Sequence, residues 1–288
     1  MDYPRPQQVR PGVAWFAART PTLPPATHTN SYALGERDVV LVEPATPFED
    51  EQREWIAWAR GLASNGRDLV GIVVTHHHVD HVGGASFFAD ALDLPLWAHP
   101  WTAEILDVPI SRQLRDGDEI TLDGPKAQRW RCLHTPGHAP GHICLHDPES
   151  GMLVVGDMVA SEGTILVAPG DGDLTAYLEQ LRRLADLEAT TALPAHGAPI
   201  ADPRRLFEHY VSHRLMRENK VMTALLRHPE GGDLDALVAI AYDDVPVAIW
   251  PLAKLSLHSH LIKLVSEGRA ERLDDATLRW RPPVSREA

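Results

Sequence analysis

The chain has 288 residues, of which 44% are hydrophobic and 23% charged, and its formal net charge is −13 at pH 7. These values are typical of a soluble globular protein with one large domain and a small one. The charge is uneven: residues 1–203 carry 14 Lys and Arg against 28 Asp and Glu, whereas residues 204–288 carry 13 against 12. The acidic part should not bind polyanions over its general surface, so a nucleic-acid role requires a local basic patch.

The ends of the chain and its cysteines predict the compartment. The first residues, Met1–Pro6, lack the basic-then-apolar pattern of an export signal, and no apolar run approaches the roughly 20 residues that a membrane span requires. Cys132 and Cys144 lie in apolar, strand-like contexts, so we expect core thiols rather than a disulfide or metal ligands. We therefore expect a cytoplasmic protein that contacts no membrane.

The first 66 residues predict strands followed by a helix. Apolar and β-branched runs indicate strands at 13–17, 31–34 and 39–42, with a turn at 29–30. A helix is expected to begin at 47–51, where acidic residues complement the helix dipole, and to end at Asn65 and Gly66.

A histidine-rich loop comes next and organises the rest of the sequence. Thr75–Gly84 holds four histidines and an aspartate. It follows an apolar run at 69–74 that is typical of a buried strand, and it precedes a short helix at 85–92. The simplest alternative, a polar loop with solvated histidines, is a poor explanation for so many ligand-type side chains at one strand end.

The spacing within this loop indicates a metal site. Residues two apart on an extended backbone share a side, so we expect His76, His78 and Asp80 to point together, with His81 on the following turn. Imidazole nitrogen and carboxylate oxygen bind zinc at about 2.0–2.2 Å. His77 should face away from the others and is expected to play a structural or supporting part.

Three later loops, each after an apolar run, supply further ligand types. A polar hairpin around 116–118 and 123–124 precedes them. The loops carry His138 with His142, then Asp157, then His196. With the first loop they offer enough side chains for two metal ions. A leucine stripe after residue 173 predicts a core helix, and the sequence contains neither a Gly-rich phosphate loop nor a Gly-x-Ser-x-Gly elbow.

This ordered set of loops resembles the ligand pattern of the metallo-β-lactamase superfamily. The resemblance implies an α/β fold, an αβ/βα four-layer sandwich over residues 1–203, with a dinuclear site along one edge. The resemblance implies that His76, His78 and His138 bind the first ion. It implies that Asp80, His81 and His196 bind the second ion and that Asp157 bridges the two. In the family the first histidine of the third loop binds metal, so His142 is expected to be structural. Glu43 and Pro44 stand where the family commonly has aspartate and glycine, a departure that leaves the ligands untouched.

Residues 204–288 predict a second, winged-helix-like domain. Helices are expected from about 204 to 227, from 233, and again up to Gly268, followed by a hairpin at 270–281. The side chains that could form a basic patch are Lys254, His258, His260, Lys263, Arg269, Arg272, Arg279 and Arg281. The alternative, which we favour, is a module that packs beside the site and shapes a pocket or a dimer interface. The two-part layout is similar to the beta-lactamase-like protein two branch, which includes an endoribonuclease on single-stranded RNA.

The resemblance implies hydrolysis by a zinc-bound hydroxide shared by two Zn²⁺ ions, with Fe or Mn as alternatives for one or both. Asp80 is the expected catalytic residue, because it can also orient the nucleophile. Glu162 and Thr164 are expected to bind substrate at the pocket mouth. A small ester, thioester or lactone is the predicted substrate, and single-strand-specific RNA cleavage is the alternative. A one-iron sulfur dioxygenase fits less well, because the complete ligand set favours two ions. A second copy of the same chain, in a homodimer, is a further candidate partner.

Overall fold

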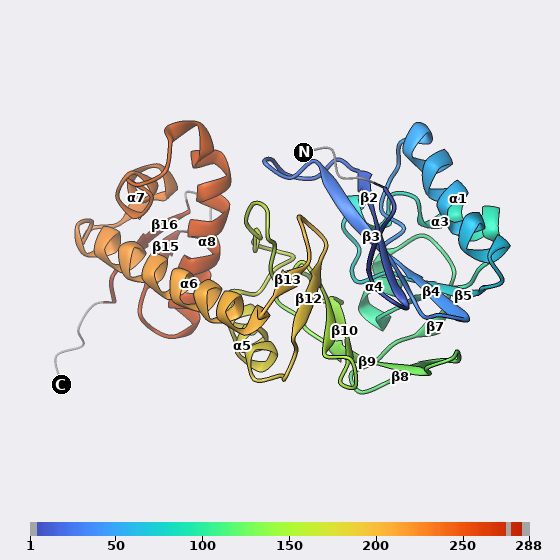
Figure 1. Cartoon of the computed structure of the whole chain (residues 1–288). Helices are drawn as coiled ribbons and strands as arrows, with labels where there is room; N and C mark the ends of the chain where they lie inside the picture. The colour runs from blue at the N-terminus through green and yellow to red at the C-terminus, as the bar shows by residue number, and fades with distance from the viewer. Residues whose placement is uncertain (1–4, 275–277, 284–288) are drawn as a thin grey trace.

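Two β-sheets form the frame of the first 201 residues (Figure 1). The computed structural model describes residues 5–274 and 278–283. One sheet has seven strands in the order β1 to β7, which span Gln7–Arg10, Val13–Arg19, His28–Leu34, Asp38–Val42, Asp68–Val73, Leu96–Ala98 and Ile110–Gln113. The other has the order β13-β12-β11-β10-β9-β8, and strands β8 to β13 span Glu119–Leu122, Gln128–His134, Ile143–Asp147, Met152–Gly156, Thr191–Pro194 and Ile200–Ala201.

Strand direction follows from the connections. Strands β1 to β4 pair antiparallel, as short links allow, whereas β4 to β7 pair parallel. Parallel neighbours need crossover connections. Helices fill these: α1 (Glu49–Ser64) between β4 and β5, α2 (Val79–Val82) and α3 (Ala85–Leu92) between β5 and β6, and α4 (Pro100–Ile105) between β6 and β7. In the second sheet, α5 (Leu174–Ala185) joins the parallel strands β11 and β12.

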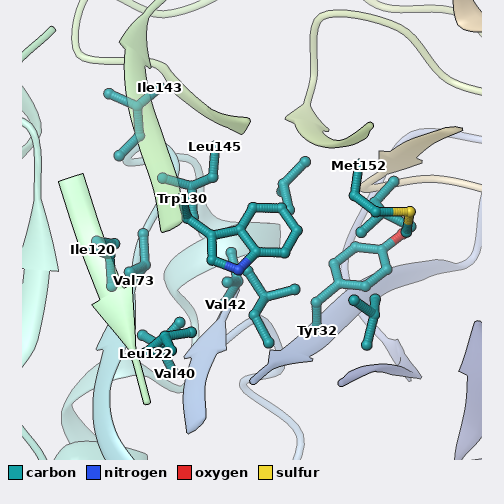
Figure 2. Packing of buried hydrophobic residues seen from close by; sticks show 14 of the residues in the cluster. Tyr32, Val40, Val42, Val73, Ile120, Leu122, Trp130, Ile143, Leu145 and Met152 are labelled. Carbon is teal, nitrogen blue, oxygen red and sulfur yellow. The ribbon is translucent and has the colours of Figure 1, made fainter. Parts of the chain in front are cut away.

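The central strands of both sheets are packed on both faces, and successive strand residues point to opposite sides. In β4, Val40 and Val42 enter the core between the sheets, while Val39 and Leu41 pack under α1 and α3. Figure 2 shows the central core, with Trp130 of the second sheet among side chains of the first. A third core lies between the second sheet and α5. The layers are therefore helix, sheet, sheet, helix, which confirms the expected sandwich.

The polar hairpin expected around 116–118 and 123–124 is present: β8 and β9 pair antiparallel, and the backbones of Gly117 and Asp118 bond to that of Cys132 in β9. Two local expectations were wrong. Thr29 and Asn30 lie within β3 and not at a turn, because buried polar bonds extend that strand: the Asn30 side chain donates to the Pro194 and Gly197 carbonyls. Asp80 lies on the helical turn α2, so the loop around it is not extended throughout.

Three helices and a small sheet make up the C-terminal part. The helices are α6 (Pro203–Leu226), α7 (Leu234–Ala241) and α8 (Trp250–Ser266), with a 3-10 turn at Val247–Ile249. The sheet has the order β14-β16-β15, from Gly232–Asp233, Arg279–Arg281 and Glu271–Asp274. These elements share an apolar core centred on Leu257, Leu261 and Trp280. This arrangement confirms the winged-helix expectation.

Helix α6 belongs to two cores. Phe207, near its start, packs with α5, and Val221, near its end, packs with α7 and α8. Figure 1 shows this helix running from the sandwich into the C-terminal helices. The division at residues 203 and 204 stays a prediction, and the first turns of α6 pack with the sandwich. Across the described residues, no helix has the length and apolar character to cross a bilayer.

Candidate metal centre

The ligand-type side chains come from loops that follow strand ends along one edge of the sandwich. The loop after β5 holds His76 and His78, and the one-turn helix α2 that follows holds Asp80 and His81. The loops after β9, β11 and β12 hold the remaining three. Because β4 and β5 are parallel, and β11 and β12 are too, their carboxyl ends bring these loops together.

Three imidazoles form a first group. His76 Nε2, His78 Nδ1 and His138 Nε2 lie 2.9–3.2 Å from one another. Two nitrogens bound to one tetrahedral zinc at about 2.0–2.1 Å would be about 3.3 Å apart. Among the described residues, this group includes no carboxylate.

Asp80, His81 and His196 form a second group. The Asp80 oxygens lie 3.8 Å from His81 Nε2 and 3.7 Å from His196 Nε2. Asp80 therefore groups with these histidines and not with His76 and His78, contrary to the expectation from an extended loop.

Asp157 lies between the two groups. One of its oxygens is 3.4 Å from His138 Nε2 of the first group, and the other is 3.4 Å from His196 Nε2 and 3.6 Å from His81 Nε2 of the second. This is the position that a bridging carboxylate requires. Its backbone N–H donates to His142 Nε2 at 3.0 Å, which fixes the loop.

The second ring nitrogen of each grouped histidine has a protein partner. His138 Nδ1 donates to the Leu166 carbonyl and His196 Nδ1 to the His28 carbonyl, both at 2.9 Å. His76 Nδ1 lies 3.0 Å from Thr75 Oγ1. Such bonds set the tautomer and aim the free nitrogen at the site.

Two carboxylates complete this outer set. Glu43 accepts from His81 Nδ1 at 3.1 Å and from the Thr75 hydroxyl. Asp171 accepts from His78 Nε2 at 2.6 Å, and its other oxygen lies 3.3 Å from His77 Nε2. From the sequence, Glu43 is a departure from the family pattern that leaves the metal ligands untouched, and Asp171 is not singled out. The adjacency of parallel strands β4 and β5 could have pointed to Glu43, whereas Asp171 is far in sequence and gives no comparable signal.

His142 and His77 occupy positions that agree with supporting roles. His142 Nδ1 donates to Thr135 Oγ1 at 2.8 Å, and its Nε2 accepts from the Asp157 backbone, so both nitrogens are engaged. His77 contacts Asp171 and belongs to neither of the two groups described above.

Burial and charge divide the two groups. Burial lowers the pKa of His138 to about 4, and burial with the neighbouring His81 and His138 lowers that of His76 well below its usual range. Burial also opposes protonation of His81, but the carboxylates of Glu43, Asp157 and Asp80 raise its pKa well above the usual value. His76 and His138 of the first group are therefore neutral imidazoles, whereas His81 of the second group lies among carboxylates.

These residues fit a dinuclear metal site. His81 Nε2 and Asp157 Oδ1 are buried, lack a hydrogen-bond partner and face each other. Buried polar atoms without partners are costly, and a shared cation would satisfy both. The donor set of imidazole nitrogen and carboxylate oxygen suits zinc, iron or manganese.

The site opens into a cavity of 230 Å³. His78, Asp80, His138, Asp157 and His196 line it, and the expected substrate residues Glu162 and Thr164 line its rim. Within the described residues, no serine or cysteine lines this cavity. Both cysteines are free and buried, and burial raises the pKa of the Cys144 thiol to about 12, so neither is a nucleophile.

The C-terminal side chains that could have formed a basic patch are largely paired or buried. His260 and Lys263 of α8 lie inside the domain. Lys263 pairs with Glu218 at 2.7 Å, Arg281 pairs with Glu271 at 2.8 Å, and Arg269 pairs with Glu218 and Glu267. These pairs leave little net positive charge for a polyanion.

Comparison with known families decides the classification. The profile of the metallo-beta-lactamase superfamily matches residues 24–196, which contain all seven grouped side chains. The chain belongs to this superfamily. A second profile, the beta-lactamase associated winged helix domain, matches residues 234–280. Members of the metallo-beta-lactamase superfamily are generally hydrolases that hold a dinuclear metal site.

Similar proteins share both parts of the chain. A beta-lactamase-like protein 2 homolog of Caenorhabditis elegans is 30% identical over 270 residues, covering 88% of this chain and 83% of its own. A metallo-beta-lactamase family protein from Thermus thermophilus superposes with a TM-score of 0.77 at 26% identity. The match covers 96% of the present chain and 100% of the Thermus chain. An atrochrysone carboxyl ACP thioesterase of Aspergillus chevalieri is 30% identical, covering 76% of this chain and 67% of its own.

Proposed function

We propose that this protein is a dinuclear zinc hydrolase that cleaves acyl esters or thioesters. The observation that carries the proposal is the convergence of two ligand groups and a carboxylate between them at a cavity that no serine or cysteine lines among the described residues. Chemistry at such a site needs water as the attacking group. The thioesterase named among the relatives supports an acyl substrate.

The proposed ligands are those expected from sequence: for the first ion His76, His78 and His138, for the second Asp80, His81 and His196, and Asp157 between them. When bound, such ions supply Lewis acidity toward a carbonyl oxygen and make water nucleophilic near neutral pH. The reaction adds water across the acyl bond and releases an acid and an alcohol or thiol.

The chain's own side chains position the reactants. Asp80 has two oxygens near the second group and lines the cavity, so it can accept a hydrogen bond from the attacking water and direct it. Glu162 and Thr164 line the rim, where we place the substrate. The bonds from Glu43 and Asp171 hold His81 and His78 in place.

Hydrolysis of a panel of acyl thioesters, esters and lactones tests this function, with thiol release measured for the thioesters and acid release for the esters and lactones. The protein is loaded with zinc, manganese or iron in turn, and metal content is measured alongside. Asp80→Asn should retain the fold and lower kcat on the order of 10²-fold or more. Cleavage of labelled single-stranded RNA without acyl hydrolysis would overturn the proposal and favour the nuclease alternative.

A further inference from the structure

A second cavity, of 430 Å³, lies beside the metal cavity. Its walls come from the loop at 23–25, the segment Gly163–Leu166, and helices α6 and α8. This volume is within the range of small-molecule sites, about 300–1,000 Å³. Figure 1 shows α8 and α6 beside the loop that follows β11. Hydrogen bonds join them there: Ser259 Oγ donates to the Val167 carbonyl at 2.7 Å.

The two cavities meet over a shared rim. Leu23, Gly163, Thr164, Ile165 and Leu166 line both. Leu23 is 47% exposed, and Gly163 and Thr164 are exposed as well. A molecule whose reacting carbonyl lies over the metal ligands can therefore extend across the rim into the second cavity.

The second cavity is lined mainly by apolar side chains and holds one unusual cation. Leu23, Leu252 and Ala253 contribute apolar surface. Arg214 lines the same cavity and is only 6% exposed. Its bonds go to the Ile165 carbonyl and to Ser256 Oγ, both neutral.

Arg214 differs from the other arginine in this cavity. Arg217 pairs with Asp244 at 2.8 Å, so its charge is already balanced. In the part of the chain that the structure describes, no carboxylate forms an ion pair with Arg214. A buried guanidinium without a counterion favours an anionic or strongly accepting ligand group.

We propose that the second cavity binds the acyl chain of the substrate, and that Arg214, which lines this cavity, binds a carboxylate carried by that chain. The inference deepens the proposed function and rests on it. It assigns the substrate class as thioesters or esters of medium-length apolar acids that carry a terminal acid group. Arg214 acts here as a specificity residue and takes no part in bond cleavage.

The acyl group, rather than the leaving group, fits this cavity. A leaving thiol or alcohol attached to a large carrier must stay connected to solvent at the mouth of the metal cavity. The second cavity presents mostly apolar side chains, among them Ile249, Leu252 and Ala253, and so suits a polar carrier poorly. It does match a methylene chain, whose burial lowers its free energy by transfer from water.

Chain length is the first test. We expect kcat/KM of the zinc-loaded protein for N-acetylcysteamine thioesters to rise roughly fourfold per methylene from acetyl toward octanoyl. A terminal carboxylate on the octanoyl chain should raise it further, by about tenfold. Equal values for acetyl, octanoyl and the terminal carboxylate would overturn the inference while leaving the proposed function standing.

Matched variants locate the effect. Leu252→Trp fills the second cavity and should cancel the gain for octanoyl while leaving acetyl within about twofold. Leu255 lies on the same helix, is exposed and does not line the cavity, so Leu255→Trp is the control. Arg214→Gln should remove the preference for the carboxylate, and Arg214→Lys should restore part of it. A similar loss in Leu252→Trp and Leu255→Trp would contradict the assignment.

A binding measurement separates the two proposals. Titration calorimetry of the protein without added metal, using 1-octanol and octanoic acid, reports the second cavity independently of turnover. We expect octanoic acid to bind about tenfold more tightly, because only the acid carries a carboxylate for Arg214, and Arg214→Gln to abolish this difference. If the zinc-loaded protein hydrolyses no acyl substrate, the proposed function fails, and this binding difference still supports the cavity. Equal binding of the alcohol and the acid would overturn the cavity assignment.

Discussion

The metal centre and the C-terminal helices both bury ionisable side chains, but they satisfy them in different ways. In the C-terminal helices, Lys263 and Arg217 are buried and meet opposite charges within the protein, in Glu218 and Asp244. Arg214, on the wall of the second cavity, is an exception. In the metal centre, each grouped histidine satisfies one nitrogen and directs the other toward its neighbours. Buried polar atoms that converge without protein partners indicate a ligand site, whereas buried charges that are paired within the protein indicate a structural role.

The largest effect should come from removing the carboxylate between the two groups. Asp157→Ala should lower the bound metal from about two ions per chain to about one, and acyl hydrolysis on the order of 10³-fold. Metal analysis after dialysis, together with kcat, measures both. His209→Ala, an exposed change on α6, is the control. If the Asp157 variant still binds two ions tightly, the Asp157 carboxylate is not required to hold them.

Removal of an outer carboxylate should have a smaller effect. Asp171→Asn keeps the shape but weakens the bond that orients His78, so zinc affinity should fall about 10- to 100-fold. Competition with a chromogenic chelator measures it. Asp173→Asn is the matched control, because Asp173 caps α5 through the Thr175 and Ala176 amides and asparagine is an equally good cap. Equal losses in both variants would contradict the positioning role of Asp171.

His260 is a buried ionisable side chain of the C-terminal core that has no hydrogen-bond partner among the described residues, so it should make stability depend on pH. It is buried, neither ring nitrogen has a hydrogen-bond partner, and burial with nearby Arg214 lowers its pKa to about 3. Below its unfolded pKa of about 6.5 the unfolded chain binds a proton that the folded chain does not, so stability falls as pH falls. From pH 7 to pH 5 this costs about 2 kcal/mol.

The measurement is urea unfolding at the two pH values. His260→Leu should lose about 2 kcal/mol less than the parent between pH 7 and pH 5, and His209→Gln should behave like the parent. An unchanged pH dependence in the His260 variant would mean that this side chain finds a proton acceptor in the folded protein.

The smallest effect should come from an exposed pair on α8. Lys254 pairs with Asp235, which is largely exposed, so Lys254→Ala should change the free energy of unfolding by less than about 1 kcal/mol. Retention of labelled single-stranded RNA in a filter assay at low salt should also be unchanged, because the charge of Lys254 is already paired with that of Asp235. A clear drop in RNA retention would show that this helix offers charge to a polyanion.

Loops that follow apolar strands indicated the candidate side chains, and the family resemblance implied both the sandwich and the grouping of Asp80 with His81 and His196. The alternation of side chains along a strand placed Asp80 with His76 and His78 instead. Asp80 joins His81 and His196 because α2 turns helically, which an alternation rule cannot foresee. Asp171 reaches His78 across 93 residues of sequence, and only the packing of α5 sets that distance. The sequence also does not reveal which polar side chains are buried. His260 and Lys263 are polar residues typical of a surface, yet the packing of α8 buries both.

Because Phe207 and Val221 of α6 anchor one continuous helix in two cores, the halves of this molecule are mechanically coupled. A rigid rod shared by two bodies permits little hinge motion between them, so the cleft on its flank has a nearly constant width. Unfolding should then occur as a single cooperative transition, and a chain cut after the sandwich would expose the apolar surface that Phe207 covers.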